Sequence, residues 1–199
     1  MFKKRMFLYF LVIAIAGILC NCGGGDSGDG GSGGGKKRIF VTSACYDADL
    51  ISEAEKVTGD ILTGPEAADA LCQLAASGGG LKGEWKAWIS DATVDAIDRI
   101  KDVGPWYLLT GEKVFNNKDN LMTTPQVPIK ITENGEHYSA DRCVYTNTEV
   151  GGKKLYICTW DGSCNQPHVY GDPESTSNEW TSVEHSGVFS NCYLYCLEQ

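Results

Sequence analysis

The chain has 199 residues, 42% of them hydrophobic and 10% aromatic, which is the composition of a globular protein with room for one ordinary domain and a leader. Three of its 17 basic residues lie within the first five positions, so the rest of the chain carries 14 basic residues against 26 acidic ones, a formal charge of −12. Such a surface repels phosphate backbones and heparin-like polyanions, which excludes nucleic acid as a partner and favours basic patches on other proteins.

The amino terminus has the layout of a signal peptide. Lys and Arg at positions 3–5 precede the run Met6–Leu19, which contains no acid or base. This run is shorter than the roughly 20 apolar residues that a transmembrane helix needs. No A-x-A cleavage site stands cleanly before the cysteines that follow. We therefore expect a lipoprotein signal peptide over residues 1–21.

Two cysteines stand one residue apart at the end of this leader. Cys22 has Leu at −3 and the small polar Asn at −1, which resembles the relaxed lipobox of spirochaete lipoproteins, whereas Cys20 follows the bulky Leu19. We expect Cys22 to become the acylated first residue, with Cys20 as the alternative. The protein would then be anchored by lipid in the cell envelope, and an outer-membrane, surface-exposed position is expected.

A glycine-rich tether follows the cysteines. Gly23–Gly35 contains only Gly, Ser and Asp, so it cannot bury apolar surface and should remain a flexible coil with a root-mean-square reach of roughly 20 Å. No G-K-[ST] follows these glycines, which argues against a phosphate-binding loop. We assign residues 22–37 to the acylated cysteine and tether, and residues 38–199 to one domain. The basic residues 36–38 are interpreted as a solvated linker end, with contact to anionic lipid as the alternative.

The first half of the domain contains the clearest elements. Arg38–Thr42 is rich in β-forming residues, and 49–57 is a candidate short helix. Gly64–Ala76 is a stronger helix prediction, because Pro65 suits the first turn and apolar residues recur at helical spacing, with Cys72 facing the core. Glu84–Ser90 alternates as a strand that places Trp85, Ala87 and Ile89 on one face.

The second half should be loop-rich. Residues 91–101 predict a further short helix, capped by Ser90 or Asp91. Short β-like pieces separated by turns then follow, at 106–109, 113–115, 127–131, 143–145, 155–160 and 193–197. Early helices followed by many short, mostly antiparallel strands define an α+β domain.

The domain has seven cysteines, and export to an oxidising compartment favours disulfides between them: Cys45, Cys72, Cys143, Cys158, Cys164, Cys192 and Cys196. Zinc is the competing interpretation, but no pair has the C-x2-C spacing of a structural zinc site, and we predict no metal. Spacing alone leaves the disulfide pairing open.

Several motifs together resemble the endostatin domain of collagens, and more closely the leptospiral endostatin-like lipoproteins. They are Ile39–Ser43, the helix end Ala67-Ala-Asp-Ala-Leu-Cys72, the stretch Gly80-Leu-Lys-Gly-Glu-Trp-Lys-Ala-Trp-Ile-Ser90, Asp98-Arg99, Tyr156-Ile-Cys-Thr-Trp160 and Cys192-Tyr-Leu-Tyr-Cys196 with the end Leu194–Gln199. The resemblance covers residues 38–199 and implies an endostatin-like variant of the C-type lectin fold. It also implies a long disulfide, Cys72–Cys196, enclosing a nested one, Cys158–Cys192. Cys45–Cys143 is then the expected third pair, which leaves one thiol over.

The resemblance implies adhesion. Characterised members of the family are surface lipoproteins that bind host laminin, fibronectin, plasminogen and complement factor H, so we expect extracellular-matrix or complement-regulatory proteins as partners. The polar stretch Gly171–Trp180 is a candidate binding loop, and Tyr170, Trp180 and Phe189 are candidate anchors, with core packing as the competing role for each. Heparin binding by clustered arginines is not carried over, because the domain has only three arginines.

Two other functions compete with adhesion. A calcium-dependent lectin would need carboxylate-bearing loop motifs, and the nearest pieces, Gln166-Pro-His168 and Asn178-Glu-Trp180, lack the required ligands. A purely structural envelope lipoprotein is the other alternative. No catalytic triad, HExxH or phosphate loop is present, so we expect neither an enzyme nor a cofactor.

Overall fold

A computed structural model of the chain describes residues 36–138, 143–164, 169–184, 189 and 191–199. The described residues belong to one compact unit that begins at Gly34. The expected signal peptide, the lipidation sites Cys20 and Cys22, and the tether up to Gly35 lie outside the described residues. None of the helices within the described ranges has the length and apolar character that crossing a membrane requires.

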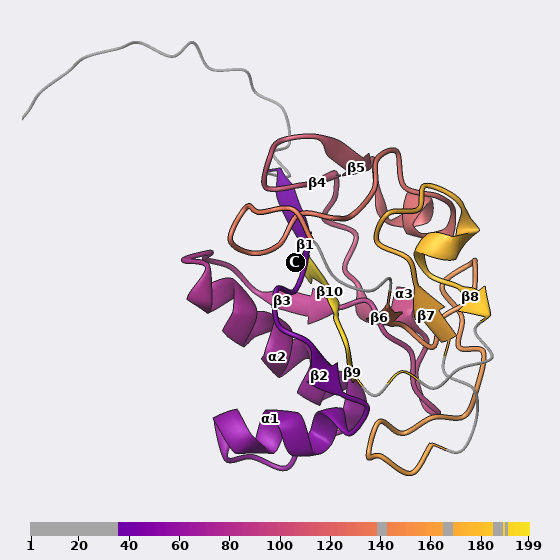
Figure 1. Ribbon diagram of the computed structural model, residues 1–199. Helices are drawn as coiled ribbons and strands as arrows, with labels where there is room; N and C mark the ends of the chain where they lie inside the picture. Colours follow the sequence, from indigo (N-terminus) through magenta and orange to yellow (C-terminus); the bar gives the residue numbers. More distant parts are fainter. Residues whose placement is uncertain (1–35, 139–142, 165–168, 185–188, 190) are drawn as a thin grey trace, which may run out of the picture. The chain divides into compact units, whose positions relative to one another are not determined.

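A five-stranded sheet forms the centre of the fold (Figure 1), and its order is β3-β10-β1-β4-β5. The first and last strands of the domain are neighbours, pairing Ile39 with Leu197 in antiparallel register. The β1–β4 pair is parallel, and the other pairs are antiparallel. The strands are β1 (Lys37–Val41), β3 (Trp85–Ala87), β4 (Trp106–Tyr107), β5 (Lys113–Phe115) and β10 (Tyr195–Glu198).

Two helices accompany this sheet, α1 (Leu50–Thr58) and α2 (Gly64–Gly78). Helix α1 starts where the Asp49 carboxylate accepts a hydrogen bond from the Ser52 amide at 3.0 Å, and it ends at Gly59 in the left-handed region. The start of α2 is fixed by a capping box between Thr63 and Glu66. The structure therefore confirms both early helices, with the first one residue later than expected.

Two smaller sheets complete the fold. One joins β2 (Tyr46–Asp47) to β9 (Asn191–Cys192), and the other has the order β6-β7-β8, with β6 at Val144–Tyr145, β7 at Val169–Gly171 and β8 at Val183–Glu184. Two 3-10 helices, η1 (Lys118–Met122) and η2 (Asn178–Trp180), lie between the strands. The described chain is thus a mixed α+β domain with short, mostly antiparallel strands, as the sequence predicts.

The central sheet is buried on both faces. Trp85, Ala87 and Ile89 pack in a core with α1 and α2, as their alternation predicts. Trp88 points to the opposite face, where it joins a second core with Trp106 and other residues of the central sheet. Both cores are apolar, so the short strand β3 is held from two sides.

The helix expected over 91–101 is wrong in extent, because only α3 (Ala96–Arg99) is helical. The Asp91 carboxylate accepts hydrogen bonds from the Thr93 and Val94 amides, at 2.7 and 2.8 Å. These bonds close a turn that delays the helix. The pieces 127–131 and 155–160 are also not strands, since the first makes only a single bridge, between Ile131 and His137, and the second makes none.

A buried ion pair joins α2, β3 and α3. The Arg99 guanidinium donates to the Asp69 carboxylate at 2.6 Å and to the backbone oxygens of Pro65, Ala87 and Ile89 at 2.9–3.1 Å. Asp69 also accepts from the Ala87 amide at 2.9 Å. The Arg99 side chain is only 7% exposed. Three of the motifs that carry the resemblance are therefore tied together by one charged pair.

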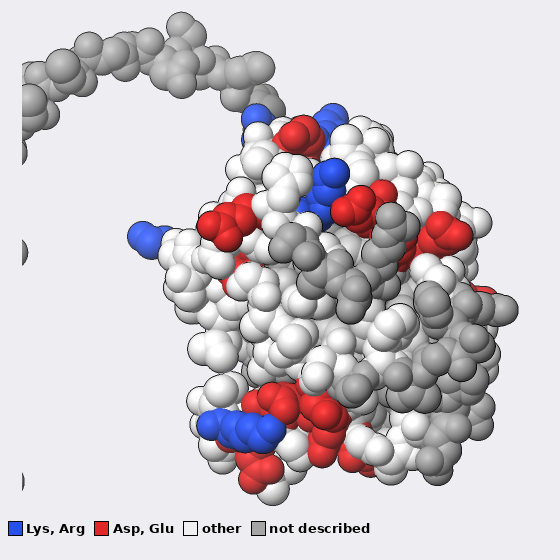
Figure 2. Space-filling view, in the orientation of Figure 1, with Lys and Arg blue, Asp and Glu red and all other residues white. Residues whose placement is uncertain are grey.

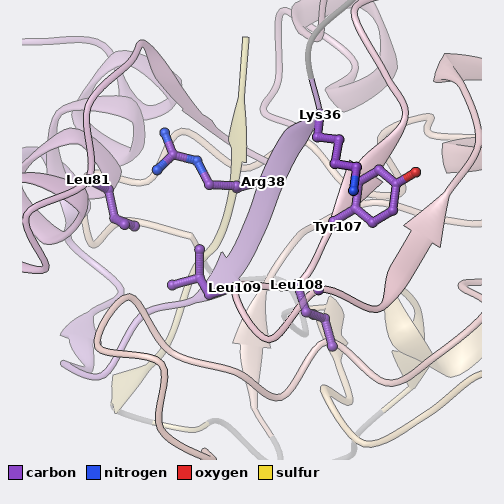
Figure 3. A pocket seen from close by; sticks show the side chains of 7 residues that line it. Lys36, Arg38, Leu81, Tyr107, Leu108 and Leu109 are labelled. Atoms are coloured by element: carbon purple, nitrogen blue, oxygen red, sulfur yellow. The ribbon is translucent and has the colours of Figure 1, made fainter. Parts of the chain in front are cut away.

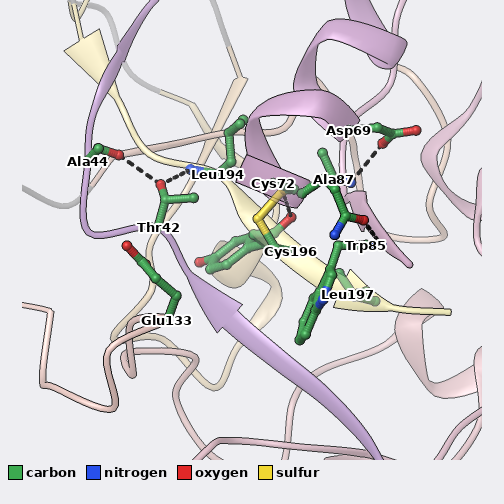
Figure 4. The surroundings of a disulfide bond; sticks show 12 residues. Thr42, Ala44, Asp69, Cys72, Trp85, Ala87, Glu133, Leu194, Cys196 and Leu197 are labelled. Atoms are coloured by element: carbon green, nitrogen blue, oxygen red, sulfur yellow. Dashed lines mark hydrogen bonds between the residues drawn. A yellow bond between two sulfur atoms is a disulfide. The ribbon is translucent and has the colours of Figure 1, made fainter. Parts of the chain in front are cut away.

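The long disulfide Cys72–Cys196 is present and confirms the expectation (Figure 4). It links α2 to β10 across 124 residues, with a Cα–Cα distance of 5.5 Å. In Figure 4 the bridge lies between Thr42, which accepts from the Leu194 amide at 3.0 Å, and Asp69 on α2. The bridge therefore fixes the last strand of the domain against its longest described helix.

The nested disulfide has a different inner partner from the one expected. It is Cys143–Cys192, with a Cα–Cα distance of 5.2 Å, so the expected pairs Cys158–Cys192 and Cys45–Cys143 are both wrong. The reason is backbone pairing: the Tyr193 amide donates to the Cys143 oxygen, and the Tyr145 amide donates to the Tyr193 oxygen. This ladder places residue 143 opposite residue 192, within the distance that a disulfide spans.

Candidate functional site

The three candidate aromatic anchors do not stand free on the surface. Tyr170 and Trp180 are fully buried, and Phe189 is half-buried with its ring 5.0 Å from that of Tyr170. Trp180 stacks on Trp88 at 5.3 Å and donates its indole N–H to the Thr123 oxygen at 2.8 Å. The competing role in core packing is therefore correct, because each ring has neighbours that cover it.

The loop that carries Trp180 does present a polar surface. We call Asp172–Glu179 the polar segment. Its two ends meet, because the Asp172 amide donates to the Glu179 backbone oxygen at 2.8 Å. The Asp172 carboxylate also accepts a hydrogen bond from the Glu174 amide at 2.9 Å. Glu174 and the residues 176–179 are exposed. The predicted surface loop is thus present, anchored at one end by a buried tryptophan and displaying polar side chains.

The electrostatics of the polar segment are one-sided. No Lys or Arg follows Lys154 in the chain, whereas two glutamates, Glu174 and Glu179, lie in this exposed stretch. A second acidic area surrounds α1, where Asp47, Asp49 and Glu53 lie close enough to raise the pKa of Lys56. Figure 2 shows acidic side chains gathered at the α1 end of the molecule. The α1 area carries Lys56 among its acids, whereas the polar segment has no Lys or Arg along its stretch and therefore suits basic partners better.

Sequence reasoning missed a cleft at the amino-terminal end of the domain, which we call the Tyr107 cleft (Figure 3). Its volume is about 410 Å³, and it is lined by Lys36, Arg38, Leu81, Tyr107, Leu108, Leu109 and Gly111. Lys36, just before β1, and Arg38 in β1 supply the basic wall, and the β4–β5 connection supplies most of the apolar wall. The Lys-Lys-Arg run at 36–38 was the one signal of this cleft in the sequence. Nothing in the sequence links that run to Tyr107.

Two lysines face the ring of the Tyr107 cleft. The Lys36 ammonium lies 5.2 Å from the Tyr107 ring centroid and the Lys113 ammonium 5.9 Å from it, distances that allow cation–π attraction. Arg38 instead donates twice to Glu198, at 2.7 and 2.9 Å, and this bond raises the pKa of Arg38. Lys37 donates to the Gln199 oxygen. The basic linker end is therefore partly built into the fold.

Three cysteines in the described ranges are outside the two disulfides. Cys45 is exposed, Cys164 is half-buried and Cys158 is buried. Burial, followed by a hydrogen bond with the Cys164 side chain, raises the pKa of the Cys158 thiol to about 12. At neutral pH that thiol is protonated, which makes it a poor nucleophile.

No group of three or more His, Cys, Asp or Glu side chains within the described ranges could hold a metal ion. Gln166-Pro-His168 lies outside the described residues. Asn178-Glu-Trp180 forms η2, with the tryptophan buried beneath it. Asn178-Glu-Trp180, one of the two lectin-like pieces, therefore anchors the end of the polar segment through its buried tryptophan.

Comparisons with known proteins add no relative: no protein-family model matches the chain, and no curated protein matches it. The class of protein defined here is therefore an α+β domain with two nested disulfides, a polar surface loop and a small basic cleft.

Proposed function

We propose that the protein is a surface-exposed lipoprotein of the outer membrane whose domain, residues 38–199, binds host extracellular-matrix or complement-regulatory proteins. The sequence motifs that resemble the leptospiral endostatin-like lipoproteins support this proposal, and so does the pairing of the first and last strands around a long disulfide. Under this proposal the fold is the endostatin-like variant of the C-type lectin fold.

The observation that carries the proposal is the construction of the polar segment. A loop that binds proteins must be exposed yet held in one shape, because ordering a flexible loop costs affinity. The bond between the Asp172 amide and the Glu179 oxygen closes the loop, and the buried Trp180 fixes its exit. Between these two points every side chain except Pro173 is polar, and Pro173 is buried.

The chemistry of the polar segment favours partners with basic patches. Glu174 and Glu179 are exposed carboxylates in a part of the chain without Lys or Arg. Binding through such charges should be fast, because opposite charges steer the two proteins together. It should also weaken as salt rises, because exposed charges are screened beyond about 10 Å at 0.1 M ionic strength. This salt dependence separates the proposed surface from an apolar interface.

The test is a titration of the soluble domain, residues 36–199, over immobilised laminin, fibronectin, plasminogen and complement factor H at several salt concentrations. All described strands, helices and disulfides lie within this stretch. We expect saturable binding to at least one of these proteins that weakens as salt rises. No binding to any of them at low salt would contradict the proposal.

A pair of matched variants locates the surface. Glu174→Gln with Glu179→Gln removes two charges from the polar segment, whereas Glu55→Gln with Asp60→Asn removes two exposed charges near α1. We expect the first variant to weaken binding by about tenfold and the second to change it by less than about twofold, since each rim charge contributes on the order of 0.5–1 kcal/mol. Equal losses would indicate a response to net charge alone.

The anchor has its own test. Incorporation of labelled fatty acid into the full chain should disappear in Cys22→Ala and persist in Cys20→Ala. Retained label in Cys22→Ala would move the anchor to Cys20. Protease treatment of intact cells should remove the domain, and full protection would place it on the inner side of the membrane.

The Tyr107 cleft favours a second function, the binding of a small carboxylate with an apolar tail. Lys36 and Lys113 flank the Tyr107 ring, and Leu81, Leu108 and Leu109 supply apolar contact. Hexanoate followed by NMR is a suitable probe. We expect shifts centred on Tyr107 that vanish in Lys36→Gln with Lys113→Gln but persist in Lys56→Gln. Unchanged shifts in the double variant would exclude the cleft.

A further inference from the structure

Two of the three unbridged cysteines lie together. Cys158 is buried in the same core as α1 and α2, and Cys164 packs against that core from its edge. After burial, the Cys164 side chain is the next largest cause that raises the pKa of the Cys158 thiol, so the two side chains lie close to each other. Their sequence spacing does not predict a pair, since neither the family resemblance nor a known short motif links positions 158 and 164.

The backbone between them turns back on itself. Trp160 and Gly162 both have positive φ, at 59° and 75°, which reverses the chain direction within a few residues. The Asp161 carboxylate then accepts from the Thr159 hydroxyl at 2.8 Å and from the Ser163 amide at 2.9 Å. These bonds close the turn that separates Cys158 from Cys164 in the sequence.

The turn is also fixed to the rest of the fold. The Cys158 oxygen accepts from the Ala92 amide at 2.8 Å, and the Trp160 oxygen accepts from the Ile51 amide at 3.3 Å. The Trp160 indole donates to the Ser90 oxygen at 2.9 Å, and its ring is fully buried. The fold therefore holds in place the turn that carries both cysteines.

We propose that Cys158 and Cys164 form a third disulfide in the exported protein. The two disulfides already in the fold indicate an oxidising compartment, so the inference is independent of the proposed binding function. The four cysteines Cys72, Cys143, Cys192 and Cys196 are already paired. Closing 158–164 leaves Cys45, which is exposed, as the single thiol of the domain.

The oxidant is a dithiol–disulfide exchange protein in its disulfide form. The thiolate of Cys164, the more exposed partner, attacks one donor sulfur, so a mixed disulfide forms while the donor S–S bond breaks. The Cys158 sulfur then loses its proton and attacks the Cys164 sulfur. The Cys158–Cys164 bond forms, and the donor leaves as a dithiol carrying the two electrons and two protons.

Peptide mapping of the full chain, recovered from the cell envelope in detergent, tests this pairing. Free thiols are trapped with N-ethylmaleimide in mildly acidic denaturant, and the chain is then cut after Lys154 and before Asp161 and Asp172 without reduction. These cuts place Cys158 in fragment 155–160 and Cys164 in fragment 161–171. We expect the two fragments as one linked mass that separates on reduction, and alkylated Cys45.

Two results would overturn the proposal: alkylated Cys158 and Cys164 in separate fragments, or either fragment linked to a fragment containing another cysteine. Thiol counting supplies a second readout. Cys164→Ser should gain one alkylated thiol relative to the wild type, because Cys158 loses its partner, whereas Cys45→Ser should lose one. If Cys164→Ser fails to fold, the wild-type map alone still decides the pairing.

Discussion

Two regions of the domain are held by different kinds of bond. The segment Gly64–Arg99, with α2, β3 and α3, is tied by a buried ion pair and by the disulfide from Cys72 to β10. The described ranges 143–164 and 169–184 are held by the small β6-β7-β8 sheet, by the disulfide from Cys143 to β9 and by polar side chains that bond to nearby backbone. For example, the Asn147 side chain donates to the Tyr156 oxygen at 2.9 Å and accepts from the Tyr156 amide at 3.2 Å.

This difference explains what each region can do. Arg99 and Cys72 make long-range contacts, so the first region is a frame whose parts depend on one another. In the second region each turn is closed locally, as with Asp161 and Asp172. Surface residues in locally closed turns can be substituted without disturbing the frame, which suits a region that displays the polar segment.

The sharpest test of this comparison is removal of each disulfide. The Cys72–Cys196 bridge closes a loop of 124 residues and Cys143–Cys192 one of 49. Chain entropy predicts losses of about 5 and about 4 kcal/mol in the free energy of unfolding for the double alanine variants. Denaturant unfolding measures both. A larger loss of stability in the Cys143→Ala, Cys192→Ala variant than in the Cys72→Ala, Cys196→Ala variant would contradict the distinction between the frame and the locally closed turns.

The ion pair of the frame gives the next largest effect. Arg99→Met leaves three buried backbone oxygens without their donor, whereas the Asp69 carboxylate, which is 18% exposed, loses the guanidinium but keeps Lys86 at 3.2 Å. We expect a loss of about 3–5 kcal/mol in the free energy of unfolding. Lys101→Met is the matched control, because its pair with Glu84 is exposed at both ends. It should cost at most about 1 kcal/mol.

Equal losses in these two variants would show that the Arg99 pair is an ordinary surface contact. Arg99→Lys sharpens the result further. A lysine keeps the charge but cannot reach Asp69 and three oxygens from one planar group. It should therefore recover only part of the lost stability.

The frame was also the region that the sequence predicted best. Pro65, the periodicity of α2 and the alternation in β3 are local signals, and each matched its element. The glycine at 83 has φ of 116° and a Cβ there would lie 2.7 Å from Glu198, so its place in the motif has a steric reason. The long disulfide was predictable only through the family resemblance.

The other region was predictable only in outline. Its strands β7 and β8 span two or three residues, too few for a period to be visible, and their pairing depends on partners distant in sequence. The choice of Cys143 over Cys158 was decided by one ladder beside Tyr193. The Tyr107 cleft arises from residues of different strands, so no local pattern could indicate it.

Neighbouring glycines test how tightly the second region sits on the frame. Gly151 and Gly152 both have positive φ, but a Cβ at Gly151 meets open space, whereas one at Gly152 would lie 2.6 Å from the Ile97 Cβ on α3. Gly151→Ala should cost about 1 kcal/mol from backbone strain. Gly152→Ala should cost about 1–3 kcal/mol more. Thermal unfolding compares the stabilities of the two variants. Equal costs would mean that α3 shifts without penalty to make room for the added methyl group.

The smallest effect concerns the turn that carries Cys158 and Cys164. Hydrogen bonds from the Ser163 hydroxyl and amide, and from Thr159, lower the pKa of Asp161 to about 2. A depressed carboxyl pKa stabilises the fold at pH values above the unfolded-state pKa, which is close to 3.9. This stabilisation is lost as the pH falls through the folded-state value. The side chain is exposed, so the loss should be small.

An NMR titration of the Ser163 amide follows this carboxylate directly, because the amide donates to it at 2.9 Å. We expect a midpoint near pH 2 in the folded protein and near pH 4 in urea. In Asp161→Asn the titration should vanish while the two disulfides and the frame persist. A folded midpoint near 4 would mean that local bonds do not close the turn, and the contrast between the two regions would then rest on the frame alone.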